Sequence, residues 1–190
     1  MAGQPFVKIT GGTAAEICAR AELKKEALQL LRDGMEPREC IDTLVANRQY
    51  VAGIDFMAHA LPPREGIWWG CLCLQHACQG EFSPADRAAC IAAVRWVLRP
   101  GEDTRAAAGP AAEAAGPASP AGALAAAAFQ TGGNVAPPNA PPKAPAPSAP
   151  AKAVATAVKL ASIKSPPAKL LDTQRSYVEL GIGMAEGRYI

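Results

Sequence analysis

The chain has 190 residues, which accommodate one domain of ordinary size with a tail and leave no room for a second large domain. Nineteen Lys and Arg residues against seventeen Asp and Glu residues give a formal net charge of +2, which excludes a strongly acidic protein and a generally basic nucleic-acid coat. The composition changes near residue 100, because residues 101–160 contain 23 Ala and residues 137–150 contain seven Pro.

The N-terminal residues lack a basic start followed by an apolar stretch, so they do not resemble a secretory signal. No apolar run approaches the ~18 residues that a membrane span requires. All six cysteines fall in helix-like segments, which is not typical of a small exported disulfide scaffold. We therefore expect a cytoplasmic protein with no membrane segment.

Apolar residues recur with the period of an α-helix throughout residues 14–100, and alternating strand patterns are absent. Residues 13–16 have the form of a capping box. The next segment predicts a helix of about three turns that ends at Gly34. Its apolar face carries Leu23, Ala27, Leu30 and Leu31.

Four more helices follow before residue 100. Prolines at helix starts and apolar stripes predict them over about 37–45, 50–61, 64–79 and 84–98. Because the connections are only a few residues long, consecutive helices should pack antiparallel as hairpins. The expected fold class is all-α, as a helical bundle or a short stack of antiparallel helix hairpins.

The second half of the chain predicts two short helices, over about 102–115 and 119–129, although Gly109-Pro110 and Pro117 interrupt the pattern. Residues 131–134 predict a turn, and the proline-rich stretch after them should be extended.

Two amphipathic patterns close the chain, and a lone tail would rarely carry them. We therefore predict a helical body (1–136), a proline-rich strap (137–150), and C-terminal helices (151–190) that pack back as part of the same fold.

Metal and thiol chemistry is suggested by the spacing Cys71-x-Cys73-x-x-His76-x-Cys78. On one helix Cys71 and Cys78 lie about 10 Å apart along the axis, too far to bind one ion. Cys73 and His76 could share a ligand, but two ligands do not close a structural site. No metal and no cofactor is predicted, and an enzyme that uses Cys73 and His76 remains the alternative reading.

The corner between the helices predicted at 50–61 and 64–79 combines polar and aromatic residues. His59 ends one helix, while Arg64 and Glu65 begin the next, where a carboxylate is favoured by the helix dipole. Trp68 and Trp69 follow directly. One interpretation is a structural corner with a tryptophan core. The other is a recognition surface, because Arg and Trp are enriched among the residues that dominate binding energies.

Five lysines and no acid occur between residues 114 and 171, a composition that resembles a nucleic-acid tail. They are Lys143, Lys152, Lys159, Lys164 and Lys169. Charges spread this thinly, without interleaved aromatic residues, would bind nucleic acid only weakly. A weak nucleic-acid accessory is therefore the second alternative.

Two patterns give the chain a family resemblance: HALPxRExxWWxC at residues 59–71 and AFxxGGxxAPP at residues 128–138. They resemble an uncharacterised bacterial family of unknown function. The resemblance implies a compact helical protein that includes the proline-rich segment. It also implies an association with gene clusters for contractile or type VI-like secretion, hence an accessory role, and it brings no catalytic residues.

The sequence thus favours a non-enzymatic protein-binding or adaptor protein. Its predicted binding surface is the corner together with the second pattern. The candidate residues are His59, Arg64, Glu65, Trp68, Trp69, Phe129 and Asn134.

Overall fold

The computed structural model describes residues 5–79, 81–136 and 139–189. Within them the chain is all-α, as predicted, with no strand. The helices are α1 (Ala14–Arg20), α2 (Lys25–Leu28), α3 (Pro37–Ala46), α4 (Tyr50–Ala60), α5 (Pro63–Cys78), α6 (Pro84–Leu98), α7 (Glu102–Ala115), α8 (Pro120–Phe129), α9 (Ala149–Ser162), the 3-10 helix η1 (Pro167–Lys169) and α10 (Leu170–Ala185).

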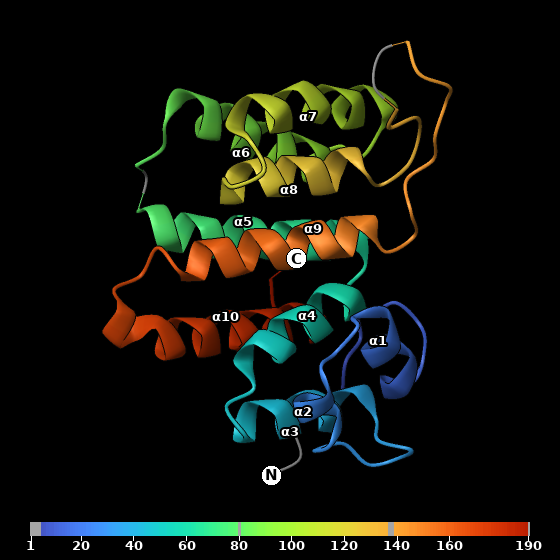
Figure 1. Cartoon of the computed structure of the whole chain (residues 1–190), viewed down its shortest axis with the longest axis vertical. Coiled ribbons are helices and arrows are strands. Elements are labelled where there is room, and N and C mark those ends of the chain that lie inside the picture. The colour runs from blue at the N-terminus through green and yellow to red at the C-terminus, as the bar shows by residue number, and fades with distance from the viewer. Residues whose placement is uncertain (1–4, 80, 137–138, 190) are drawn as a thin grey trace.

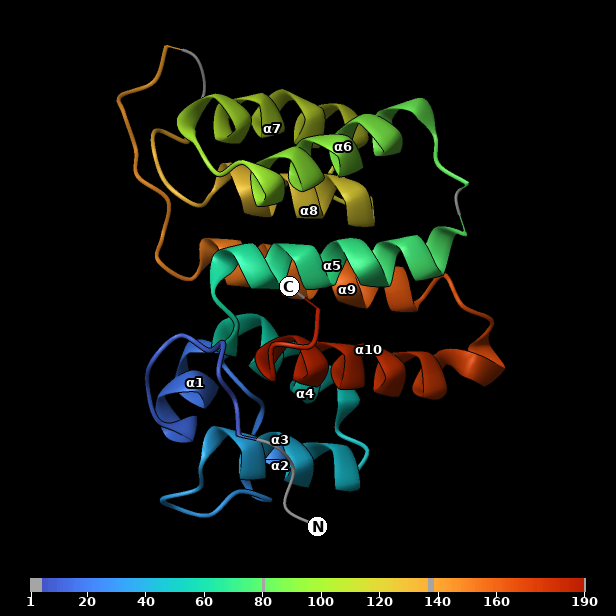
Figure 2. The ribbon, with the colours of Figure 1, turned by 180° about the vertical axis from the view of Figure 1, so that it is seen from behind.

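The helices stack in layers along the long axis of the molecule (Figure 1). One end holds α6, α7 and α8, which follow one another as antiparallel hairpins. The next layers are α5 beside α9 and then α4 beside α10, and the far end holds α1, α2 and α3 (Figure 2). None of the helices in the described ranges is long and apolar enough to cross a membrane.

The C-terminal helices belong to the same core as the N-terminal ones. In α9, Val154 and Val158 are buried between α5 and α8, and in α10 Tyr177 and Val178 are buried against α4 and α5. One continuous hydrophobic cluster includes these residues and the cores of the other layers. The proline-rich segment therefore connects two parts of one core.

The described part of the strap, residues 139–148, runs along the outside of the stack from the end of α8 to the start of α9 (Figure 1). It is fastened at Lys143, whose backbone N–H donates to Asn134 Oδ1 over 2.8 Å. The Val135 N–H donates in turn to the Lys143 carbonyl over 2.9 Å. Residues 137 and 138, which end the AFxxGGxxAPP pattern, lie outside the described residues.

Helix starts follow the sequence signals. The Thr13 side chain accepts from the Glu16 N–H and the Glu16 side chain accepts from the Thr13 N–H, which completes the predicted capping box of α1. Pro37, Pro63 and Pro84 occupy the first turns of α3, α5 and α6, where the missing N–H costs nothing.

The predicted three-turn helix before Gly34 is wrong. Glu22 adopts a left-handed conformation with φ 51°, so the chain turns away after α1, and only Lys25–Leu28 is α-helical. Leu31 then bonds to the Leu28 carbonyl with i to i−3 spacing, which ends the helix. The residues of the predicted stripe still face the core, since Leu23 and Ala27 are buried and Leu30 and Leu31 are half-buried, but a turn and a one-turn helix present them instead of one long helix.

The predicted helix over 102–115 is confirmed, but it passes through Pro110 without a break. Gly109 allows the Phe129 ring to approach closely, because a Cβ there would lie 3.1 Å from the ring. Tertiary packing between α7 and α8 thus outweighs the loss of one backbone hydrogen bond at the proline.

Candidate functional site

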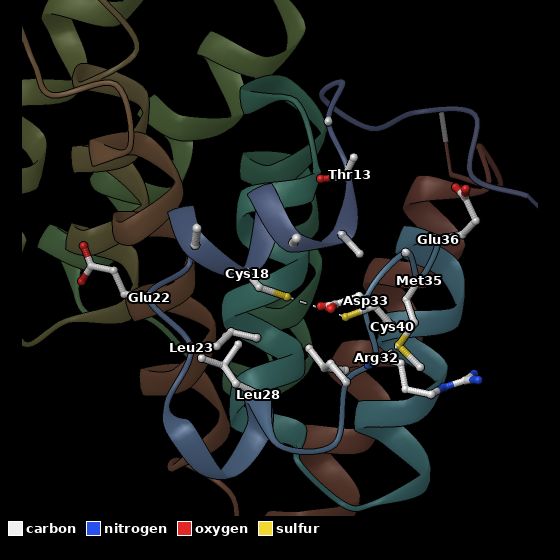
Figure 3. A pocket seen from close by; sticks show the side chains of 16 residues that line it. Thr13, Cys18, Glu22, Leu23, Leu28, Arg32, Asp33, Met35, Glu36 and Cys40 are labelled. Carbon is white, nitrogen blue, oxygen red and sulfur yellow. Dashed lines mark hydrogen bonds between the residues drawn. The ribbon is translucent and has the colours of Figure 1, made fainter.

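The main cavity lies between α1, α2 and the start of α3, and it has a volume of about 730 Å³. Its apolar lining comes from Leu23, Leu28, Leu31 and Met35 (Figure 3). The turn at Glu22 creates the main cavity. The chain changes direction there and carries α2 across the open side of α1 and α3, instead of extending α1 into one long helix. The volume and the apolar lining are typical of sites that hold a small ligand or an anchoring side chain.

Charged side chains lie around the mouth of the main cavity. Glu22 pairs with Lys152 of α9 over 2.6 Å, and this hydrogen bond lowers the pKa of the Glu22 carboxyl. Arg32 pairs with Glu39. Asp33 and Glu36 also line the cavity, and neither has an ion pair among the described residues. The cavity mouth therefore carries uncompensated negative charge.

Two thiols lie at the base of the main cavity. Cys18 of α1 and Cys40 of α3 face each other with their sulfurs 3.8 Å apart (Figure 3). The hydrogen bond with Cys40 lowers the pKa of the Cys18 thiol, and the same bond raises the pKa of the Cys40 thiol. The contact therefore favours loss of the proton from Cys18 over loss of the proton from Cys40.

His59 lies in a second cavity of about 470 Å³, between α1, the α4–α5 corner and the start of α9. The residue is 6% exposed, and its Nδ1 donates to the Asp55 carbonyl over 2.9 Å. Nε2 is buried and has no hydrogen-bond partner among the described residues. Burial lowers the pKa of His59, so the neutral imidazole is favoured rather than the cation that the helix end would attract.

The rest of the corner joins α5 to the end of α6. Arg64 is exposed and its Nε donates to the Val97 carbonyl over 2.9 Å. Glu65 is half-buried and has no ion pair among the described residues. Arg64 therefore satisfies a helix-terminal carbonyl, which is a structural task that leaves the remaining guanidinium donors at the surface.

The two tryptophans have different positions. Trp69 is 0% exposed, and its Nε1 donates to the Tyr177 carbonyl of α10 over 2.9 Å. Gly181 makes this approach possible, since a Cβ there would lie 3.1 Å from the indole. Trp68 is half-buried against the core. Trp69 is therefore a core residue, and only Trp68 can present part of its ring to a partner.

Residues of the AFxxGGxxAPP pattern hold the end of α8 against the start of α7. Phe129 is half-buried beneath the Arg105 guanidinium, which lies 4.9 Å from the ring centre and donates to the Phe129 carbonyl over 2.7 Å. Gly133 has φ 65°, and a side chain there would collide with Arg105. Asn134 is exposed and binds the strap. Arg105, which is buried and also pairs with Glu102, organises this end.

The corner and the AFxxGGxxAPP pattern lie on the same side of the stack, where α5 begins and α8 ends (Figure 1). On this side, His59 faces the second cavity, Arg64 contacts α6, and Phe129 contacts α7. The residues of the two sequence patterns thus make three separate sets of contacts.

Cys73 and His76 do not form a pair. Cys73 is wholly buried, and burial raises the pKa of its thiol far above its ordinary value. His76 is exposed, with Nδ1 3.4 Å from the Tyr177 hydroxyl. Within the described ranges, no group of three or more His, Cys, Asp and Glu side chains could hold a metal ion.

Two of the five lysines of the second half form ion pairs with the N-terminal half. Lys152 contacts Glu22, and Lys159 contacts Asp55, each over 2.6 Å. These lysines fasten α9 to α4 and to the turn after α1, so their charge is partly neutralised within the protein.

The comparisons with known proteins identify one family. No curated protein and no solved structure matches the chain significantly. Residues 40–185 match a family of unknown function, DUF6931. The matched span runs from Cys40 in α3 through the last residue of α10, so it covers most of α3, all of α4 to α10 and the strap, and it leaves out α1 and α2. The chain therefore belongs to the DUF6931 family.

Proposed function

We propose that this protein is a non-enzymatic adaptor whose main cavity holds an apolar side chain of a partner protein. The observation that carries the proposal is the cavity itself: about 730 Å³, lined by leucines and Met35, with Leu28 45% exposed at its edge. An apolar pocket of this size bordered by an exposed leucine is typical of anchor sites in protein interfaces. Met35 adds an unbranched side chain that adapts to different anchors.

The charge at the mouth specifies the partner further. Asp33 and Glu36 have no cation beside them within the described residues, while the other charged lining groups, Glu22 and Arg32, are already paired. A partner segment that places Lys or Arg next to its apolar anchor would complement these carboxylates. The occupant that fits is therefore an apolar residue flanked by basic residues.

The test uses the tagged full-length protein, its own host as the source of partners, and two matched leucine variants. Leu28→Glu places a carboxylate at the edge of the main cavity. Leu98→Glu places the same charge at the end of α6, where Leu98 is 70% exposed and far from the cavity. Any protein that co-purifies is then expressed alone and tested for direct binding.

We expect direct binding to survive Leu98→Glu, to fall at least tenfold with Leu28→Glu, and to weaken with Glu36→Lys. Binding that is equal for wild type and Leu28→Glu would overturn the proposal. Binding that depends instead on Arg64 would assign the partner to the corner surface that the sequence suggests. Trp69→Ala is unsuitable for this purpose, because it removes a fully buried core residue.

The accessory role in contractile or type VI-like secretion that the family resemblance implies remains a prediction. The identity of the partner in the same experiment tests it: a component of such an assembly would support the role.

A further inference from the structure

The six cysteines of the chain differ in their surroundings. Cys18 and Cys40 are the pair whose sulfurs are in contact, at 3.8 Å, among the described residues. They lie 22 positions apart in the sequence, on different helices. The thiols of Cys71 and Cys73 point into the α5 core instead, where burial raises the pKa of both.

The contacting pair is also reachable. Both cysteines line the main cavity, and Figure 3 shows the two sulfurs facing each other at its base. Cys18 is 4% exposed and Cys40 is 0% exposed, so a small solute in the cavity contacts Cys18, and Cys40 lies directly behind it. Formation of a disulfide by a peroxide requires this combination of a reachable sulfur and a second thiol beside it.

We propose that Cys18 and Cys40 form an oxidisable dithiol site that hydrogen peroxide or another small hydroperoxide converts to a disulfide. The Cys18 thiolate attacks one peroxide oxygen: an S–O bond forms, the O–O bond breaks, and the departing hydroxide combines with the Cys18 proton as water. The Cys40 sulfur then attacks the Cys18 sulfur. The S–S bond forms, the S–O bond breaks, and the second hydroxide leaves as water with the Cys40 proton. The two sulfurs together lose two electrons, which reduce the peroxide.

The order of attack follows from the exposure of the two residues. Cys18 keeps 4% exposure and Cys40 has none, so the peroxide reaches Cys18 first, and the hydrogen bond between the thiols also lowers the pKa of the Cys18 thiol. Cys40 then already lies against the sulfur that it must attack, so the second step is intramolecular. A sulfenic acid with an adjacent thiol condenses to a disulfide rather than oxidising further.

Closing the bond requires a small movement. The sulfurs must approach from 3.8 Å to about 2 Å, the length of a disulfide bond. Cys40 lies in the first turn of the ten-residue α3, whereas α1 is only seven residues long and the chain on both of its sides is non-helical. A shift of α1 toward α3 supplies the movement without disturbing the layered helices.

The experiment treats the folded full-length protein with one equivalent of hydrogen peroxide, unfolds it, alkylates the free thiols and digests it with trypsin. Cleavage after Lys8, Arg20, Arg38 and Arg48 places the two cysteines on separate peptides, residues 9–20 and 39–48. We expect these peptides to appear joined, with a mass two hydrogens below their sum, and to separate on reduction. The other four of the six cysteines should be alkylated.

Two serine variants and an unfolded sample are the controls. Cys18→Ser should abolish the joined peptides, while Cys78→Ser, which removes a half-buried thiol elsewhere, should leave them unchanged. The chain oxidised in urea should give a mixture of pairings, so dominance of Cys18–Cys40 in the folded protein reports the native contact.

The proposal is wrong if Cys18 and Cys40 remain fully alkylated while other cysteines of the folded protein oxidise, or if each oxidises separately to a sulfinic acid. The reaction needs no partner protein. Its outcome is therefore independent of the adaptor proposal, whose test is direct binding by the reduced protein.

Discussion

The crossing of α5 and α8 depends on a glycine. A Cβ at residue 70 would lie 2.5 Å from Leu124 Cδ1, well inside van der Waals contact. Leu124 is fully buried at the centre of α8, so its end cannot rotate into solvent to make room. Gly70→Ala should therefore overpack the crossing, and Leu124→Ala should leave a cavity that faces Gly70.

The magnitudes predict a coupled pair. Alanine at residue 70 gains about 1 kcal/mol of helix propensity. It loses about 1–3 kcal/mol to overpacking, so Gly70→Ala alone should be neutral or destabilising by up to about 2 kcal/mol. Leu124→Ala alone should cost about 2–5 kcal/mol. In the double variant the new methyl occupies space that Leu124 vacates, so the overpacking disappears and the coupling should favour the pair by about 1–3 kcal/mol.

Denaturant unfolding of the four proteins, followed by circular dichroism, gives the free energies of this cycle. The double variant should be at least as stable as Leu124→Ala alone. Gly66→Ala is the matched control on the same helix, because a Cβ there would meet only ordinary contacts at 3.8 Å and beyond. It should stabilise the protein by up to ~1 kcal/mol. Additivity of Gly70→Ala and Leu124→Ala within about 0.5 kcal/mol would refute the reasoning.

Three further substitutions test other parts of the structure. Gly122→Ala should destabilise by at least ~2 kcal/mol in the same unfolding assay, because its Cβ would collide with the Gly116 carbonyl oxygen, which belongs to the backbone and cannot move aside. Burial lowers the pKa of His59 from 6.5, so the unfolded chain binds more protons than the folded protein. The stability of the protein should therefore fall as the pH drops below 6.5. His59→Gln should reduce this loss, which melting temperatures measured from about pH 5 to pH 8 would show. Arg105→Lys should cost about 1–2 kcal/mol in denaturant unfolding, because a lysine cannot stack on the Phe129 ring while bonding its carbonyl; an unchanged free energy would contradict this role.

The sequence predicts the fold well wherever the signal is local. The capping box at Thr13 and the prolines at residues 37, 63 and 84 locate helix starts, because a cap or a first-turn proline depends only on neighbouring residues. Apolar residues cover most of the circumference of the helix after Pro63, a pattern typical of a buried helix, and Trp69 at its centre is fully buried.

The candidate site is less accessible to sequence reasoning. His59, Arg64 and Phe129 are recognisable as unusual residues, but their contacts are with Asp55, Val97 and Arg105, and only the tertiary structure supplies two of these partners. The main cavity arises from the left-handed turn at Glu22, a residue type with no strong preference for that conformation. No local pattern marks the turn, so neither the cavity nor the contact between the two thiols at its base can be read from the spacing of residues.

The alanine-rich composition, which first suggests a low-complexity tail, has a structural reason. In α8, alanines and Leu124 are buried around nearly the whole helix, because α6, α7 and α9 pack against it from different sides. Small side chains let four helices approach one another closely, and they lose little side-chain entropy on burial. A disordered segment is depleted in apolar residues, whereas this one supplies the centre of a layer. The densest run of prolines lies in the strap, where an extended chain needs no internal hydrogen bonds and leads α9 back to the core. Composition alone therefore marks a change in packing style within one fold rather than the end of the folded domain.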